Sequence, residues 1–346
     1  MEQHLWNKLK KWLKLKNFNL ELNPPPTKFT NGMGNLNYKI FLDHKAYVLR
    51  RPPLGPIPPG ANDMKREHLV MSSLHKELPL VPNSILFSED INIFGAPFHI
   101  MEYKEGFTIN GDTFPSELHN AKDVKIISEM LISTLVKIHK IDPKNAGLEN
   151  LGKPEGFLER QLEGWFKRGL IAHQNKNLHN ITQLYETLKN RPRPEDYKPS
   201  ILHNDFKLDN IILKKKNNNI FPSAIIDWDQ ATRGHPLYDL ATLLSYWTVQ
   251  SDSDDMRLIK QMPSEQDGFI SRLEAIKQYK YLSGNSIDNF NWIYSLSLLK
   301  LGVVFQQLFA QYIRGTVKDK KYLVFEKVAE ASYRRGLNII MNDEII

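Results

Sequence analysis

The sequence predicts an α+β chain of two unequal lobes: a small N-terminal lobe built on an antiparallel sheet and a larger, mainly helical C-terminal lobe. Short strand-like runs separated by turn residues fill the first hundred residues, whereas apolar residues at helical spacing dominate from about residue 123. With 346 residues, 41% of them hydrophobic, the chain can build a core large enough to divide in this way. We place the lobe boundary after residue 103, so the small lobe comprises residues 1–103 and the large lobe comprises residues 104–346.

The first element is predicted to be an amphipathic helix over residues 3–20, because apolar residues recur at i,i+4 spacing among lysines. Such a helix could lie on a membrane surface, but packing of its apolar side onto the rest of the lobe is commoner and is preferred here. The segment lacks the uninterrupted apolar run of a secretory signal. Its apolar residues are Leu5, Trp6, Leu9, Trp12 and Leu13.

Strands and one helix are predicted for the rest of the small lobe. Residues 51–60 contain five prolines and two glycines and are therefore expected to form a loop. Residues 61–63 can cap a helix over residues 64–76. A Gly-bearing turn over residues 31–35 separates the first two predicted strands. The strand candidates are residues 28–30, 36–42, 46–50, 84–87 and 98–102.

Helices separated by short buried strands are predicted for the large lobe. The lysine run at residues 214–216 is interpreted as a solvated hairpin turn. The most apolar stretch, residues 294–313, contains Lys300 and three glutamines, so we expect a buried helix rather than a membrane span. The predicted helices cover residues 124–139, 156–170, 178–189 and most of the chain after residue 236, and the strands cover residues 201–202, 210–213 and 224–226.

Composition narrows the function classes. The chain has no cysteine, which excludes disulfides, thiol catalysis and thiolate metal sites and fits a reducing compartment, so we expect a cytoplasmic protein. The net charge of +7 suits an anionic substrate or a nucleic acid. However, the basic residues are scattered and no nucleic-acid module is recognisable, so neither a nucleic-acid nor a membrane partner is expected. The sequence carries no signal for oligomeric state.

Two segments, residues 201–213 and residues 224–230, carry the candidate chemistry. Asp205 precedes Asn210 by five residues in a loop between apolar strands, and Asp227 follows another apolar strand directly. Phosphoryl transfer from ATP needs such a set: a carboxylate at the acceptor hydroxyl and oxygen ligands that hold Mg²⁺. Asp and Asn also cap ordinary turns, and His203 could simply satisfy a buried carbonyl. Two motifs, each in a strand context, favour the functional interpretation.

With these motifs and four further segments, the chain resembles the aminoglycoside phosphotransferase and choline kinase family of the protein-kinase-like superfamily. It is most similar to the branch of kinase-like domains that are fused to acyl-CoA dehydrogenases. The resemblance runs from about Phe29 to Ala241 and implies a bilobal protein-kinase-like fold, with ATP and Mg²⁺ as cofactors. The further segments are residues 47–53, 64–67, 135–139 and 234–241.

In the large lobe, the resemblance implies that Asp205 is the catalytic base or orienting carboxylate for the acceptor hydroxyl, and that Asn210 and Asp227 hold magnesium. Lys207 would approach the transferred phosphoryl group, or it would be a solvated lysine. Asp229 would be a further acid at the metal site, or a surface carboxylate.

In the small lobe, the resemblance implies a nucleotide site. The turn that contains Gly32 and Gly34 would cover the phosphates, and Glu67 would pair with a cation on the third strand. An arginine replaces the lysine that the family has there: Arg50 is our assignment, with Arg51 as the alternative. The complete set of nucleotide-binding candidates is Gly32, Gly34, Asn35, Arg50, Glu67, Met101 and Tyr103.

The sequence therefore favours a kinase that acts on a small hydroxylated molecule. No activation loop with an Ala-Pro-Glu segment follows Asp227, so protein is a less favoured acceptor; Asp239 would instead anchor the following turn to the catalytic loop. The basic charge favours a hydroxy acid or hydroxyacyl-CoA over an aminoglycoside. A nucleotide-binding pseudokinase and a metal-dependent hydrolase using His203, Asp205, Asp227, Asp229 and His235 are the alternatives. The predicted wall of the acceptor pocket contains Arg160, Gln161, Trp165 and Arg168.

Overall fold

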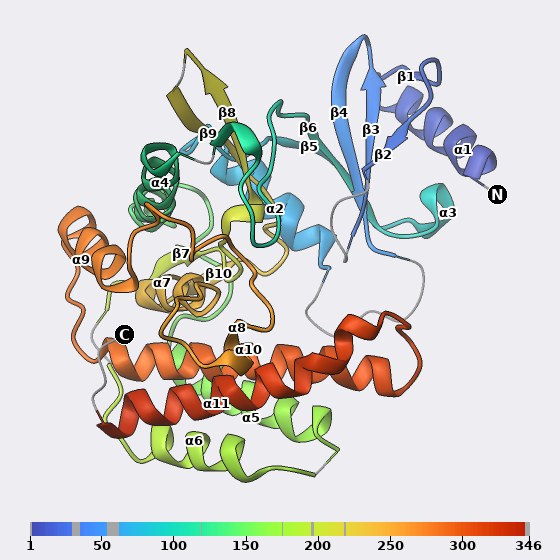
Figure 1. Cartoon of the computed structure of the whole chain (residues 1–346). Helices are drawn as coiled ribbons and strands as arrows, with labels where there is room; N and C mark the ends of the chain where they lie inside the picture. The colour runs from blue at the N-terminus through green and yellow to red at the C-terminus, as the bar shows by residue number, and fades with distance from the viewer. Residues whose placement is uncertain are drawn as a thin grey trace.

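The structure is a computed structural model that describes residues 2–29, 35–53, 62–118, 120–174, 176–194, 197–217 and 219–342. Figure 1 shows a small lobe of strands and three helices at the N-terminal end, and a large lobe in which helices predominate. The predicted α+β, two-lobed architecture is confirmed. Gly32 and Gly34 lie outside the described residues, so the predicted phosphate turn is not described.

The small lobe is built on an antiparallel sheet with strand order β1-β3-β4-β6-β5, in which β2 also pairs with β3. The hairpin between β3 and β4 turns at Asp43 and His44, which both have positive φ, as tight hairpin turns require. The short strand β1 was not predicted, because the first helix was expected to reach residue 20; the observed helix ends at Leu15, five residues before β1. The strands are β1 (Leu20–Glu21), β2 (Thr27–Lys28), β3 (Leu36–Leu42), β4 (Lys45–Arg51), β5 (Ser84–Ser88) and β6 (Phe98–Glu102).

Helices cover both faces of this sheet. Helix α1 (Glu2–Leu15) buries Trp6, Leu9 and Leu13 in a cluster that includes Leu49, whereas α2 (Met64–Leu74) packs with Val48 in the other core cluster. Neighbouring strand residues point to opposite faces, so Val48 and Leu49 belong to different layers. The short helix α3 (Ile91–Phe94) lies beside α1. The preferred interpretation of the first helix, packing onto its own lobe, is confirmed.

The large lobe surrounds one long apolar helix, α10 (Phe290–Ile313). By length and composition α10 could cross a membrane, but 78% of its apolar window is buried inside the protein. The prediction of a buried helix is therefore confirmed. Helix α10 packs against α5, α6, α7 and α11. The other helices are α4 (Ala121–His139), α5 (Phe157–Ala172), α6 (His179–Lys189), α7 (Pro236–Ser245), α8 (Asp254–Arg257), α9 (Arg272–Ser283) and α11 (Phe325–Asn342).

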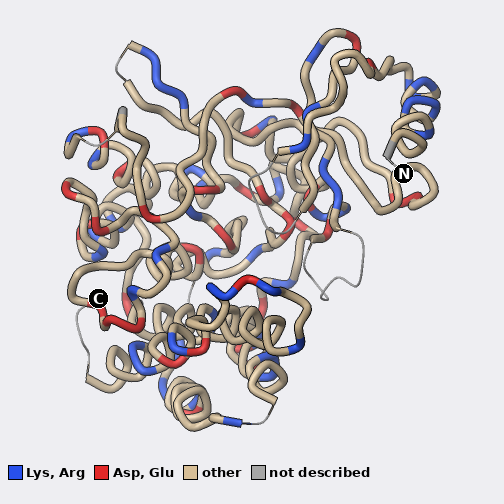
Figure 2. Tube along the Cα trace, turned by 45° about the vertical axis from the view of Figure 1, so that its right-hand side comes forward, with Lys and Arg blue, Asp and Glu red and all other residues tan. Residues whose placement is uncertain are grey.

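Two small antiparallel sheets of two strands each carry the segments with the candidate chemistry. Strand β7 (Ser200–Leu202) pairs with β10 (Thr232–Gly234), and β8 (Ile211–Lys216) pairs with β9 (Asn219–Ile225). The expectation of a lysine-rich turn is wrong, because Lys214, Lys215 and Lys216 all lie in β8 and pair with β9. Alternation is visible in the first part of the strand: Ile211 and Leu213 are buried, whereas Ile212 and Lys214 are only partly buried, and the strand ends in the exposed Lys215 and Lys216. Figure 2 shows the basic residues spread over the chain, including a group on α1.

Candidate active site

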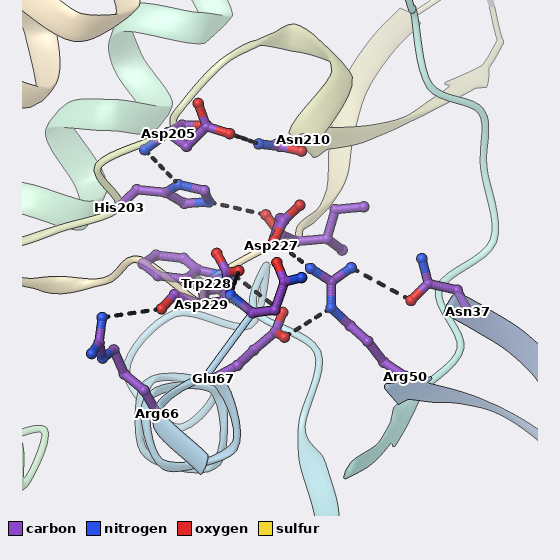
Figure 3. A network of polar contacts seen from close by, with 12 residues as sticks. Asn37, Arg50, Arg66, Glu67, His203, Asp205, Asn210, Asp227, Trp228 and Asp229 are labelled. Carbon is purple, nitrogen blue, oxygen red and sulfur yellow. Dashed lines mark hydrogen bonds and ion pairs between the residues drawn. The ribbon is translucent and has the colours of Figure 1, made fainter. Parts of the chain in front are cut away.

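The loop after β7 and the segment after β9 meet at one place, as Figure 3 shows. The backbone N–H of Ile226 donates to the carbonyl of Asn210 over 3.0 Å, and Nε2 of His203 lies 2.9 Å from the carbonyl oxygen of Ile226. The Asn210 amide closes the loop by donating to the carbonyl of Asp205 over 2.8 Å. Residues some twenty positions apart in sequence therefore form one structural unit.

Asp239, in the first turn of α7, fixes the backbone of this loop through hydrogen bonds. Its carboxylate accepts the backbone N–H groups of His203 at 2.6 Å and of Asn204 at 2.7 Å, and its side chain is fully buried. Burial alone would raise the pKa of Asp239, but the hydrogen bond and charge of His139 and the bonds from the loop hold it below its usual value. The predicted anchoring of the turn to the catalytic loop is confirmed.

The carboxylate of Asp205 is held by several side chains. Tyr246, just beyond α7, donates its hydroxyl to Oδ1 of Asp205 over 2.7 Å. Nζ of Lys207 lies 3.7 Å from Oδ2 of Asp205 and 3.3 Å from Oδ2 of Asp209, so this lysine pairs with two acids. The sequence analysis missed Tyr246, because an aromatic residue at the end of an apolar helix carries no signal that separates it from the core.

Arg50 connects the lobes. Its guanidinium donates through Nε to Oε2 of Glu67 over 2.8 Å, pairs through Nη2 with Oδ1 of Asp227, and reaches Asn37 at 3.4 Å. Burial alone would raise the pKa of Glu67, but the charge of Arg50 outweighs it and lowers the pKa to about 2. Arg51 turns to the other face of the sheet, where it donates to the carbonyl of Phe94. Of the two assignments considered, Arg50 is the arginine that pairs with Glu67.

The segment from Asp227 to Asp229 lies against α2. The backbone N–H of Trp228 donates to Oε1 of Glu67 over 3.2 Å, and that of Asn62 donates to Oδ2 of Asp229 over 2.9 Å. Asp227 itself has φ of 70°, an uncommon conformation for a non-glycine residue that is found at functional sites. Asp229 is buried, so its interpretation as a surface carboxylate is wrong.

The donor set fits a magnesium ion. The side-chain nitrogen of Asn210 donates to the carbonyl of Asp205, so its side-chain oxygen remains available as a metal ligand. The carboxylate of Asp227 is a second oxygen ligand of the kind that Mg²⁺ prefers. Burial and the nearby charges of Asp227 and Glu67 raise the pKa of Asp229 to about 8, and a cation bound beside these carboxylates would oppose that rise. Among the described residues no three His, Asp or Glu side chains form a metal cluster; Mg²⁺ commonly uses one or two protein ligands and completes its shell with phosphates and water.

A cavity of about 360 Å³ lies between the sheet and the large lobe. Arg50 and the predicted hinge residues Met101 and Tyr103 all line it. Asn35 does not line this cavity; its side-chain oxygen is buried without a hydrogen-bond partner among the described residues. The cavity is lined by Phe29, Asn37, Val48, Arg50, Pro82, Met101, Glu102, Tyr103, Lys104, Gly106, Phe107, Thr108, Ile212 and Ile226.

The predicted acceptor wall is assembled in part. Nε1 of Trp165 lies 3.1 Å from Oε1 of Gln161, and the guanidinium of Arg168 lies 3.7 Å from the centre of the Trp165 ring. Arg160 is exposed and turns away to donate to the backbone carbonyls of Lys153 and Glu155. Three of the four candidates therefore lie together, and Arg160 does not join them.

Comparison with known proteins identifies related chains. The model of the family described as "APH: Phosphotransferase enzyme family" matches residues 26–264. "Acyl-CoA dehydrogenase family member 11" of Gallus gallus is 28% identical over 321 residues, which are 90% of this chain and 40% of that protein. The protein of the same name from Homo sapiens is 29% identical over 89% of this chain and 39% of its own length. The chain thus spans about 40% of the length of these curated relatives.

Solved structures share the fold. A Ralstonia eutropha protein described as a "putative aminoglycoside phosphotransferase" aligns with a TM-score of 0.77 at 22% identity, covering 96% of this chain and 98% of that one. An ethanolamine kinase from Plasmodium vivax aligns with a TM-score of 0.57 at 14% identity, covering 92% of this chain and 84% of that one. At these identities the comparison supports the fold, including the two lobes described above.

Proposed function

The chain belongs to the phosphotransferase enzyme family, and from that premise we propose that it transfers the γ-phosphoryl group of ATP, with Mg²⁺, to a hydroxyl group of a small molecule. One observation carries the proposal: Asp205, Asn210 and Asp227 converge beside a cavity between the lobes, and Arg50, which lines that cavity, pairs with both Asp227 and Glu67. Phosphoryl transfer depends mainly on positioning and electrostatic stabilisation, which such a constellation provides.

Each residue has a role in this proposal. Asp205 orients the acceptor hydroxyl and takes its proton as the oxygen bonds to the γ-phosphorus; the bond to the β-phosphate oxygen breaks, and ADP leaves. Tyr246 and Asn210 hold the Asp205 carboxylate in place. Asn210 and Asp227 would hold Mg²⁺, which offsets phosphate charge when bound. Lys207, which lies beside Asp205, would attract the transferred group.

The apolar and polar parts of the cavity suit a nucleotide. Val48, Met101 and Ile226 provide apolar surface for a base, and Arg50 provides charge at the same cavity for phosphates. Met101 is mostly buried at the end of β6, where the family resemblance places the hinge. These contacts support binding of ATP, with GTP as the competing donor in the test below.

A pseudokinase is the second candidate, because an arginine replaces the usual lysine. The contacts favour an arginine that takes over the role of the lysine: Arg50 pairs with Glu67, as that lysine is expected to do. Arg50→Lys keeps the charge but cannot span Glu67 and Asp227 at once, so we expect at least a tenfold loss of kcat/KM for the nucleotide. Nucleotide-dependent thermal stabilisation without transfer to any acceptor would instead support the pseudokinase.

A metal-dependent hydrolase is less well supported. Nε2 of His203 faces the carbonyl of Ile226, and Nδ1 of His235 accepts the N–H of Leu237 over 3.2 Å, so both rings are engaged in the fold. Hydrolysis of a phosphoester without any nucleotide would favour this function over a kinase.

For the acceptor, we propose a hydroxy acid or a hydroxyacyl-CoA rather than an aminoglycoside. The basic net charge of +7 suits an anion. The names of the relatives connect this family branch with acyl-CoA metabolism, although the matched region is about 40% of those proteins and no dehydrogenase activity is proposed. A chain without cysteine fits the cytoplasm, where we propose that it acts.

The test is a transfer assay with γ-labelled ATP or GTP and a panel of hydroxy acids, hydroxyacyl-CoAs, choline-like alcohols and aminoglycosides. Asp205→Asn and Asp227→Ala should each lower phosphate transfer more than about 100-fold while the protein stays folded. The exposed Asp112→Asn serves as a matched control and should leave transfer unchanged. Full turnover in both site variants would refute the proposed function.

A further inference from the structure

His99 is a fully buried histidine on the sheet face that meets α2. In β6 it stands directly opposite Arg50 of β4, so both side chains point to the same face of the sheet. Val48 and Met101 form the next pair on that face, and together with Arg50 they line the cavity between the lobes. His99 does not line this cavity, so any part that it plays in nucleotide binding must act through a neighbouring side chain.

His99 and Arg50 converge on one oxygen of Glu67. Nε of Arg50 donates to Oε2 of Glu67 over 2.8 Å, and Nε2 of His99 lies 3.3 Å from the same oxygen. Nε2 makes no well-aligned hydrogen bond among the described residues, so this contact is mainly electrostatic. Burial raises the pKa of Glu67, but Arg50 and then His99 outweigh burial and lower it to about 2. The carboxylate that holds Arg50 is therefore itself held by His99.

A hydrogen-bonded chain sets which ring nitrogen of His99 carries a proton. Oγ of Ser84, a buried residue of β5, lies 2.8 Å from Nδ1 of His99 and 2.9 Å from Nδ1 of His68 on α2. The single hydroxyl proton can be donated to only one of these nitrogens, so the hydroxyl accepts from the other. If Ser84 accepted from His99, the neutral ring would turn a lone pair at Nε2 toward the Glu67 carboxylate. Donation from Ser84 to His99 avoids that repulsion and places an N–H at Nε2.

The other end of this serine–histidine chain is fixed by packing. His68 is half-buried, and its ring stacks on that of Phe87 with the two centres 5.4 Å apart. Burial, and after it the nearby His99, lower the pKa of His68. His68 is therefore neutral near pH 7, and a proton at Nδ1 lets it donate to Ser84. The stacked ring thus keeps the Ser84 hydroxyl turned toward His99.

We propose that His99 is a positioning residue that fixes the Glu67 carboxylate and, through it, directs Arg50 to the phosphates of the nucleotide. This rests on the phosphotransferase function proposed above and adds to it a residue outside the cavity. Arg50, His99 and the backbone N–H of Trp228 hold the carboxylate together, so it has little freedom to rotate before a ligand binds. Without His99 the carboxylate can turn, and Arg50 can move wholly to Asp227, its second partner.

The test measures phosphate transfer and, by calorimetry, binding of a non-hydrolysable ATP analogue with Mg²⁺ to the full chain. His99→Leu should raise KM and Kd for the nucleotide about 5- to 20-fold and leave kcat within about threefold, because Arg50 is misdirected before the nucleotide binds. His99→Gln keeps an N–H group and should recover most of the affinity. The matched control His173→Leu removes a buried histidine of the large lobe, 3.3 Å from the Tyr333 hydroxyl, and should change neither constant.

A double-mutant cycle separates positioning from general destabilisation. His99→Leu should weaken nucleotide binding much less in the Arg50→Lys background than in the wild-type chain, because both substitutions act on the same contact. Equal losses in the two backgrounds would overturn the proposal, as would an unchanged Kd in His99→Leu. If the leucine variant does not fold, Ser84→Ala carries the same test: it removes the hydrogen bond to Nδ1 and should raise Kd about 2- to 5-fold, again only when Arg50 is present.

Two readouts separate this inference from the proposed function. In nitrogen-15 NMR of labelled histidines, the signal that His99→Leu removes should show a proton at Nε2, and a bare Nε2 would overturn the proposal without any ligand. If no acceptor is phosphorylated but the analogue binds, and binding weakens in His99→Leu, the positioning role stands and the kinase function fails. If phosphate is transferred and His99→Leu keeps its nucleotide affinity, the positioning role fails and the kinase function stands. A wild-type chain that binds no nucleotide would overturn both.

Discussion

Asp239 provides a direct test of how the catalytic loop is held. Its two oxygens accept the N–H groups of His203 and Asn204 at 2.6 and 2.7 Å in a fully buried site. Asp239→Asn keeps one acceptor oxygen and turns an NH₂ group toward the other donor. Hydrogen bonds to charged groups contribute about 1.5–3 kcal/mol, and an unsatisfied buried donor adds to the loss. We therefore expect the substitution to lower the free energy of unfolding by roughly 2–4 kcal/mol.

The assays are urea and thermal unfolding together with phosphate transfer. At roughly 2–4 °C for each kcal/mol, Tm should fall by about 5–15 °C. Below the transition, kcat should fall about 100-fold, because a small displacement of Asp205 misaligns the acceptor. Nucleotide affinity should change much less, since the cavity lining does not include Asp239.

A matched variant separates loop position from general stability. Asp252 is also buried and accepts from Nη1 of Arg272 and from the N–H of Val249, both at 2.9 Å, but it does not touch the catalytic loop. Asp252→Asn should destabilise the protein to a similar extent and keep its kcat at low temperature. The reasoning fails if Asp239→Asn keeps wild-type stability and kcat, or if both variants lose kcat equally.

Three further predictions concern other parts of the molecule. Tyr246→Phe removes the 2.7 Å hydrogen bond to Asp205 and should lower kcat about 3- to 10-fold with Tm nearly unchanged; an unaltered kcat would contradict it. Leu9→Ala creates a cavity under α1 and should cost about 2–5 kcal/mol in urea unfolding with kcat unchanged, whereas a loss below 1 kcal/mol would exclude tight packing there. Burial and the nearby charge of His139 lower the pKa of His235 from 6.5 to about 4. Between these values the unfolded chain binds a proton that the folded chain does not, so stability should fall by up to about 3 kcal/mol as the pH drops from 6.5 to 4. His235→Asn keeps a cap for α7 and should flatten that dependence, measured by urea unfolding across the pH range; an unchanged slope would show that other groups cause it.

Local pattern was enough to predict much of the fold. The bounds of β3 and β6 agree with the predicted residues 36–42 and 98–102, because apolar and β-branched residues there are bordered by turn residues. The apolar side of α1 was also predictable from its spacing. Failures occurred where an element is too short to show a period: β10 has three residues and pairs with β7, some thirty residues earlier in the chain.

The candidate site was partly predictable for the same reason. Asp205, Asn210 and Asp227 stand at the ends of apolar strands, so their types and spacing carry a signal in the sequence. Lys300 also left a trace, since a single lysine in an apolar helix needs a polar partner, but its partner, the carbonyl of Asn204, is 96 residues away. Tyr246 left none.

The sequence by itself determined which residues carry charge and which strands and helices they stand on. The tertiary structure decided their partners. Arg50 and Arg51 show the difference: adjacent strand residues point to opposite faces, so one arginine reaches Glu67 and Asp227 while the other reaches Phe94. Which face meets α2 and the large lobe depends on contacts between segments far apart in the chain, and those contacts arise only when the chain has folded.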